Sequence, residues 1–308
     1  MIGAAARRLA GSVLVLWGAV TVTFLALHLT SGDPVDLITG LRASSDQLRA
    51  EIVREYGLDR PLPLQYLTYL GHILQGDLGH SYVLHLPVRT AIGQQLGATL
   101  ALLAATVVTT LVVSVPAALL GAGRRPWVRT PVSLLEGLGV AVPAFWLGTL
   151  LLGVFSFRLR WFPALGTPGV EGLVLPALAL AAAPAAVITR VLRRGLEQTL
   201  DEPFVTTART RGIGEAAVRL RHALRHGLLP VTTLVGWLTG SLIGGAVVIE
   251  SVFSRQGLGT LAVSAVRSKD LPLVIGVVLV AGLVCTVVNT AVDLSYRLID
   301  PRLRSRET

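Results

Sequence analysis

Long apolar runs separated by shorter polar connections dominate the pattern along the chain. Runs of about 20 mostly apolar residues begin near Leu9, Leu96, Val132, Leu173, Leu228 and Leu273. A helix of that length, rising about 1.5 Å per residue, crosses a hydrocarbon core roughly 30 Å thick. The pattern therefore predicts an all-α integral membrane protein with six transmembrane helices.

The first apolar run follows Arg7 and Arg8, as in a secretory signal peptide. It continues from Leu9 to Leu29, which is longer than the apolar region of about 7 to 15 residues in such signals, and no small-residue cleavage site closes it. We therefore expect residues 1–30 to form a retained N-terminal transmembrane helix.

The longest polar segment, residues 31–93, separates the first two runs. Ser45 can cap one helix that ends near Gly57, and a second amphipathic helix is predicted from Pro63 to about Leu74. On the outer membrane face, such helices would suit a lid over a pore mouth or a docking rim. A packed loop cap without any partner is the alternative interpretation.

Composition and charge agree with a membrane protein. Charged residues make up 15% of the chain and its mean hydropathy is +0.67, whereas soluble domains carry about 25% charged residues. If the N-terminus is cytoplasmic, 17 of the 27 Lys and Arg residues fall on the cytoplasmic side, as the positive-inside rule requires. Both termini are then cytoplasmic. Topology accounts for the net charge of +9, so we expect no nucleic-acid partner.

Several chemistries lack the residues that they need. The only cysteine, Cys285, cannot form a disulfide within the chain or a thiolate metal site. The only lysine, Lys269, stands in "RSKDLP", which is not a phosphate-binding loop, so the chain cannot bind ATP in that way. Without a nucleophile elbow, paired carboxylates at depth or a zinc motif, we predict no catalytic residues and no metal or cofactor bound by this chain.

The segment "TTARTRGIGEAAVRLRHALRHGLLP", residues 206–230, stands out as basic between apolar runs. Asp201 or Glu202 can cap a short helix with Pro203 at its first position, and Gly212 can end it. We expect the small residues Thr206, Thr207 and Ala208 to be exposed there, which would suit the groove of another protein. A basic loop held to anionic lipid is the alternative.

Residues 204–236 read "FVTTARTRGIGEAAVRLRHALRHGLLPVTTLVG", and this segment resembles the signature cytoplasmic loop of ABC importer permeases. The resemblance extends to "GDP" at 32–34, "VPAFWLG" at 142–148, "ESVFSRQGLGTL" at 250–261 and "VDLSYRLIDPRLR" at 292–304. The chain is similar to the B-type permease subunit of dipeptide, oligopeptide and nickel importers.

This resemblance implies partners and a role for the basic segment. Such permeases pair with a second homologous permease and dock two cytoplasmic ATP-binding subunits, which bind ATP and Mg, while an extracytoplasmic solute-binding protein delivers the substrate. It places a permease core at residues 94–297, a coupling loop at 198–227 and a cytoplasmic tail at 298–308, in the bacterial inner membrane. The residues implied in ATPase docking are Pro203, Phe204, Thr207, Ala208, Arg209 and Gly212.

One departure from the family pattern concerns the start of the coupling helix. Pro203 and Phe204 stand where the family usually has an acidic residue and a tyrosine. Proline suits the first position of a helix, so docking should survive while the choice of partner could differ. Peptides are the favoured substrate; nickel and haem stay open, as does an ATP-independent secondary carrier.

Ionisable or polar groups within apolar runs point to function, because they are costly in a bilayer. We interpret Glu250, Asn289, His28 and Trp146 as candidate residues of the translocation path or its gate. Glu136 and Asp293 lie nearer the ends of spans, where nearby arginines could pair with them.

Two remaining patterns have competing interpretations. Gly236, Gly240 and Gly244 recur every four residues, which favours close helix packing against the partner permease over a path-lining face. His222 and His226 have the spacing of a zinc helix but lack its glutamate. The outer His72, His80 and His85 could meet a metal substrate, although unrelated surface histidines are the simpler interpretation.

Overall fold

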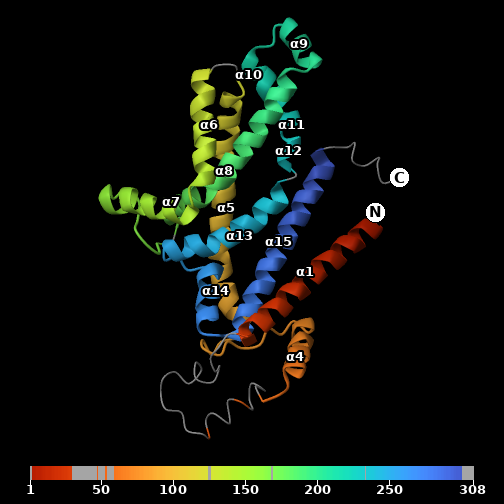
Figure 1. The fold of residues 1–308 in the computed structure, drawn as a ribbon, viewed down its shortest axis with the longest axis vertical. Coiled ribbons are helices and arrows are strands. Elements are labelled where there is room, and N and C mark those ends of the chain that lie inside the picture. The colour runs from red at the N-terminus through yellow and green to blue at the C-terminus, as the bar shows by residue number, and fades with distance from the viewer. Residues whose placement is uncertain are drawn as a thin grey trace. The chain divides into compact units, whose positions relative to one another are not determined.

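The computed structural model describes residues 2–29, 47, 53, 59–123, 126–167, 169–232 and 234–299. These residues form helices and turns (Figure 1), with one isolated β-bridge between His80 and Pro87. The predicted helix from Ser45 to Gly57 lies almost wholly outside the described residues.

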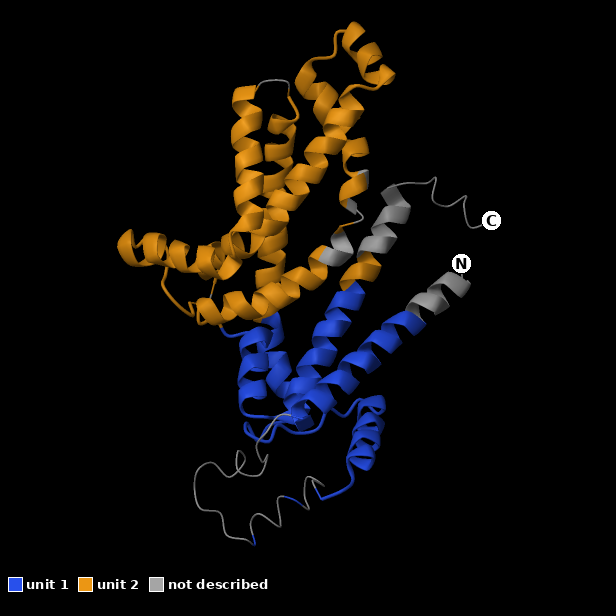
Figure 2. Ribbon diagram, viewed as in Figure 1, with its two compact units in different colours: residues 1–97, 256–287, 307 blue, residues 98–255, 288–306, 308 orange. Residues whose placement is uncertain are grey.

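The chain divides into two compact units (Figure 2). Unit 1 comprises residues 1–97 and 256–287, and unit 2 comprises residues 98–255 and 288–306. Two long helices, α5 (Val88–Gly121) and α15 (Leu271–Ile299), contribute to both units.

Unit 1 contains α1 (Ile2–Leu29), α4 (Leu62–Leu74), α14 (Leu258–Arg267) and the first parts of α5 and α15. Val20 and Phe24 of α1 are buried with Ile275 of α15, and one face of α4 packs against them. A second cluster joins Val88 and Ile92 of α5 to α14 and α15. The predicted helix from Pro63 to Leu74 is confirmed.

A buried aspartate organises the turn before α15. Asp270 is fully buried, and its carboxylate accepts hydrogen bonds from the Ser81 hydroxyl and from the amides of Val83 and Leu273, the latter two at 3.3 Å. Asp270 thus caps α15 and ties it to the loop before α5. Burial, with Tyr82, Asp270 and Asp77 nearby, raises the pKa of Tyr69 above its usual range, so this tyrosine stays neutral.

Unit 2 is built around α8 (Glu171–Leu200). Helix α8 packs against α6 (Pro126–Ala141), α7 (Ala144–Leu151) and α13 (Val235–Val252). A Cβ atom at Gly139 of α6 would lie 2.7 Å from Ala186, and one at Gly245 of α13 would lie 2.6 Å from Leu180. At Gly139 the carbonyl oxygen of Ala182 would also lie 3.0 Å away, so glycine is needed for α6 to approach α8, whereas at Gly245 the flexible end of the Leu180 side chain could move.

Four helices in the described part of the chain are long and apolar enough to cross a membrane: α1, α5, α8 and α15. The pair formed by α6 and α7, the latter continued by the π-helical segment η1 (Leu152–Arg158), would be a fifth span, but it is bent by 105°. The apolar part of α13, residues Leu238–Val252, is shorter than a full membrane span. The prediction of an all-α membrane protein is confirmed, whereas the count of six spans is not.

The bend between α6 and α7 has a local cause. Pro143 precedes α7 in an extended conformation, and its missing N–H and its ring disfavour a continuous helix through this position. Gly148 then lets α7 approach Phe253, at 3.1 Å from the position of a Cβ atom. The kink expected in "VPAFWLG" is therefore present, as a complete break between two helices.

Candidate coupling loop and buried polar groups

The basic segment begins with a short helix, α9 (Pro203–Thr210). Glu202 adopts an extended N-cap conformation without a side-chain capping bond, and Pro203 occupies the first turn. Gly212 has φ +79°, and its amide donates to the carbonyl of Arg209 at 2.9 Å. The predicted helix and its glycine terminus are confirmed, since a positive φ favours glycine.

One face of α9 packs on the rest of the loop. Val205 and Ala208 are buried in a cluster with Leu200 of α8, Val218 and Ala223. The expectation that Ala208 is exposed is therefore wrong, because it lies three residues after Val205 and shares its face.

The opposite face of α9 is open. Thr206, Thr207 and Phe204 are exposed, Phe204 by 41% of its surface. The ring centroid of Phe204 lies 5.4 Å from that of His226, which orients the aromatic side chain at the start of the helix. The two threonines and Phe204, together with the exposed Pro203, Arg209 and Thr210, form the surface that α9 can offer to another protein.

Arg209 links α9 to two neighbouring segments. Its guanidinium donates to both carboxylate oxygens of Glu215, at 2.7 and 3.4 Å, and to the carbonyl of Leu200 at 3.4 Å. Glu215 begins the next helix, α10 (Glu215–Ala217), and Leu200 is the last residue of α8. Arg209 thus connects α9 to the end of α8.

The loop returns to the spans through η2 (Val218–Ala223), α11 (Leu224–Gly227) and α12 (Leu229–Thr232). Arg219 of η2 donates to the carbonyl of Leu119 near the end of α5, at 3.2 Å. The basic segment is therefore fastened to α5 as well as to α8.

A buried ion pair joins α6 to α8. The Arg193 guanidinium donates to both oxygens of Glu136, at 2.8 and 3.0 Å, and also to Glu197 at 3.0 Å. Glu136 and Arg193 are 3% and 6% exposed, and Arg190 lies 3.6 Å from Glu136. The expectation that nearby arginines pair with Glu136 is confirmed, but Arg193 was not singled out from the sequence.

Glu250 is fully buried within unit 2. Its Oε1 accepts a hydrogen bond of 2.6 Å from the hydroxyl of Thr99, which links α13 to α5. Ile249 and Phe253 beside it belong to an apolar cluster that includes Leu102. The carboxylate therefore has a specific partner and faces no surface of the chain.

The other three candidate path residues lie apart from Glu250 in the sequence and differ in setting. His28 contacts the carbonyl of Phe24 through Nδ1 at 2.8 Å, which satisfies one ring nitrogen within α1. Trp146 on α7 is 50% exposed. Oδ1 of Asn289 is buried and finds no hydrogen-bond partner in the part of the chain that the structure describes. The side chain of Asp293 lies outside the described residues.

The glycine stripe on α13 is not packed against another described helix of this chain at Gly240 and Gly244. A Cβ atom at Gly240 or Gly244 would meet nothing within 4 Å. The environment of Gly236 is not described. Inside the chain, the close contact of α13 uses the neighbouring Gly245 instead.

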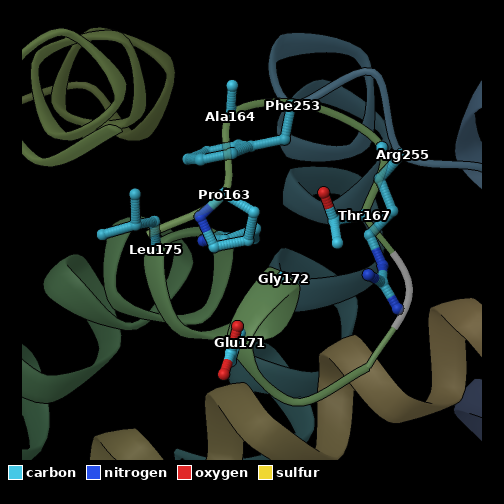
Figure 3. Close-up of a pocket in the computed structure, with 10 residues that line it drawn as sticks. Pro163, Ala164, Thr167, Glu171, Gly172, Leu175, Phe253 and Arg255 are labelled. Carbon is cyan, nitrogen blue, oxygen red and sulfur yellow. The ribbon is translucent and has the colours of Figure 1, made fainter. Parts of the chain in front are cut away.

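Figure 3 shows a small cleft that sequence reasoning missed. It lies where the loop containing Pro163 and Thr167 meets the start of α8 and the end of α13, with Glu171 and Arg255 contributed by separate segments. Its cavity volume is only about 10 Å³, far below the range of roughly 300 to 1,000 Å³ for ligand pockets. We assign no ligand to it.

Two models of one protein family match this chain over most of its length. Residues 112–305 match the model of the binding-protein-dependent transport system inner membrane component, and residues 1–103 match its N-terminal model. The chain belongs to this family. It is thus a multi-pass permease component of a bacterial inner membrane.

Individual relatives cover nearly the whole permease. A protein of Brucella suis, provisionally named a peptide permease, is 41% identical over 298 residues, 91% of this chain and 92% of the relative. The glutathione transport system permease protein GsiC of Salmonella typhimurium is 36% identical over 299 residues, 97% of each chain. A protein of Brucella abortus, provisionally named a peptide transport system permease, is 37% identical over 310 residues, 97% of this chain and 98% of the relative.

Proposed function

We propose that this chain is the permease subunit of an ATP-driven ABC importer. With a second homologous permease it forms the translocation path for dipeptides or oligopeptides delivered by a solute-binding protein. The observation that carries the proposal is α9, a short helix closed by Gly212 and fastened by Arg209, whose open face has no large apolar residue except Phe204. The names of the relatives support peptides, since glutathione is itself a small peptide.

The coupling loop passes conformational changes of the ATPase subunits to the membrane helices. We place α9 in a cleft of a partner ATPase, where Thr206, Thr207 and Phe204 make the contact. The buried Ala208 packs α9 against the rest of the loop. Movement of α9 passes to α8 because Arg209 holds the carbonyl of Leu200. ATP binding then favours one of two states of the permease and its hydrolysis restores the other.

Catalysis and cofactor binding are left to the partner subunits. It contributes no catalytic residue and binds no cofactor, since ATP and Mg belong to two ATP-binding subunits. Six spans with both termini cytoplasmic are proposed, with residues 1–30, 31–93, 94–297 and 298–308 as the N-terminal helix, outer loop domain, permease core and tail. The distribution of Lys and Arg supports this orientation.

Glu250 remains our foremost candidate for the path, with Asn289, His28 and Trp146 beside it. Its hydrogen bond with Thr99 joins α13 to α5 in the present state. The carboxylate can reach the path only where these two helices separate, which suits a gating role in alternating access. The open stripe of Gly240 and Gly244 is proposed to face the second permease.

The experiment that tests this function is a tagged purification from native membranes in mild detergent. Every co-purifying chain is identified by mass spectrometry. We expect a second permease and ATP-binding subunits, with the associated binding protein narrowing the substrate. Recovery of this chain alone, repeated after crosslinking, would contradict the importer and favour an ATP-independent carrier.

A further inference from the structure

Helix α4 is unusual for a helix in a polar outer segment. Its sequence, LPLQYLTYLGHIL, contains no Asp, Glu, Lys or Arg, and its only histidine is His72. A helix on an aqueous surface normally carries charged residues on the side that faces water. Helix α4 therefore lacks the composition of a water-exposed element.

One face of α4 is fixed against two membrane spans. Tyr66, Tyr69, Leu70 and Ile73 pack on Val20, Phe24 and Ile275. The hydroxyls of Tyr66 and Thr21 share a hydrogen bond of 2.6 Å, and the rings of Tyr66 and Phe24 lie 5.3 Å apart. These contacts determine which side of α4 points away from unit 1.

The outward side also carries an apolar stripe, beside the exposed Thr68 and His72. Leu64, Leu67 and Leu74 are exposed by 48%, 62% and 87%, and their spacing of three and seven residues places them on one stripe. A second, unpartnered apolar stripe on a helix of 13 residues is typical of an element that lies in a membrane boundary.

The contacts of α4 also fix its depth along the spans. Phe24 and Val20 lie five and nine residues before Leu29, the end of the first span, and Ile275 lies four residues after Leu271, where the last span begins. At about 1.5 Å per residue these offsets correspond to roughly 6 to 14 Å inside the span ends. Interfacial helices bury their apolar face to a similar depth, about 5 to 10 Å.

We propose that α4 is embedded in the boundary zone of the bilayer and that lipid acyl chains cover Leu64, Leu67 and Leu74. Tyr66 and Tyr69 then lie at the level where tyrosines gather in membrane proteins. This assignment replaces the lid or docking rim that the sequence suggested, because a rim for a soluble partner would stand beyond the span ends. It requires neither the orientation of the chain nor its substrate.

The test uses the assembled complex in phosphatidylcholine vesicles, with Cys285→Ser and any exposed cysteines of the partners removed. A polarity-sensitive fluorophore is attached at Leu67→Cys, and separately at Leu74→Cys should the first variant fail to assemble. Quenching is measured with lipids that carry a nitroxide on a shallow acyl carbon, and with iodide in the water. Asp59→Cys, just before α4, is the aqueous control, and Leu70→Cys on the packed face controls for helix orientation.

We expect nitroxide lipids to quench the fluorophore at position 67 and iodide to leave it unaffected, while position 59 shows the reverse. Quenching by iodide at both positions would overturn the proposal. Protection from both quenchers, together with a crosslink from position 67 to another protein, would overturn it as well and identify a docking surface instead.

Discussion

At the scale of single residues, Glu136 and Arg193 form a buried ion pair in unit 2. Both side chains are almost fully buried, and the two hydrogen bonds between them are parallel. Such a bidentate arrangement compensates a guanidinium and a carboxylate that have both lost water. Removing only one partner leaves a buried charge without compensation.

Glu136→Gln should therefore destabilise the complex by about 3 to 5 kcal/mol, the usual effect of breaking a buried ion pair from one side. Thermal unfolding of the purified complex in detergent measures this change. Glu197→Gln is the matched control, because Glu197 also binds Arg193 but its side chain is 29% exposed, and it should have a smaller effect.

The double variant Glu136→Leu with Arg193→Leu separates the charge from the packing. We expect it to recover much of the lost stability, since neither charge is then left alone. A double variant as unstable as the single one would show that the shape of these side chains, and not their pairing, matters.

For Glu250 we expect a functional effect without loss of the complex. Glu250→Gln keeps an oxygen that can accept the hydrogen bond from Thr99 but removes the negative charge. Peptide uptake into proteoliposomes should change while the amount of assembled complex does not. If instead expression falls and uptake per complex stays normal, Glu250 has a structural role.

The sequence could show that Glu136 needs a cation, because a carboxylate in an apolar run is costly. It could not show which cation. Arg190 and Arg193 lie one helical turn apart on α8, and the approach of α6 to α8 through Gly139 decides that Arg193 is the bidentate partner.

At the scale of elements, α9 was predictable in its bounds and unpredictable in its orientation. Pro203 and Gly212 are local signals, and they set where the helix begins and ends. Which face is buried depends on Val218 and Ala223, which come later in the chain and are brought there by the fold. Ala208 was therefore placed on the wrong face.

Substitutions at Gly212 test the terminus of α9. Gly212→Glu should leave the chain in the membrane yet abolish uptake or ATPase docking, because it adds both a side chain and a charge at the proposed interface. Its φ of +79° also makes an ordinary residue costly, by about 1 to 2 kcal/mol. Uptake and co-purified ATPase are measured together.

Gly212→Asn provides the control, since asparagine tolerates a positive φ better than most residues do. It should retain more docking than Gly212→Glu. Normal uptake by Gly212→Glu would refute the coupling assignment.

The spans illustrate a different limit of sequence reasoning. The length of an apolar run predicts that a segment can enter a membrane, but it does not reveal a bend of 105° between α6 and α7. Pro143 marks the place of the break. Its size depends on the contacts that α7 makes with α8 and α13, such as the close approach at Gly148.

At the scale of the whole molecule, the number of crossings decides the sides of the termini. The described helices include four clear spans, or five with the bent pair, whereas we propose six. An even number places both termini on one side, and an odd number places them on opposite sides.

We expect added protease to cleave tags at residues 1 and 308 together in inside-out vesicles. In intact spheroplasts both tags should be protected. Single cysteines extend this test along the chain: labels at positions 165 and 268 should react from outside and one at 206 only from inside. Termini on opposite sides would rule out six spans, and an inward label at 165 or 268 would revise the order of the crossings.

The ion pair between α6 and α8 also has a consequence for how the protein is made. Glu136 is synthesised 57 residues before Arg193, and a charged residue within a membrane segment is costly until it is paired. Helix α6, with only 16 residues, has little apolar length to offset that cost. We therefore expect α6 to leave the insertion machinery for lipid most readily after α8 has emerged, so that the two helices enter the bilayer as a neutralised pair.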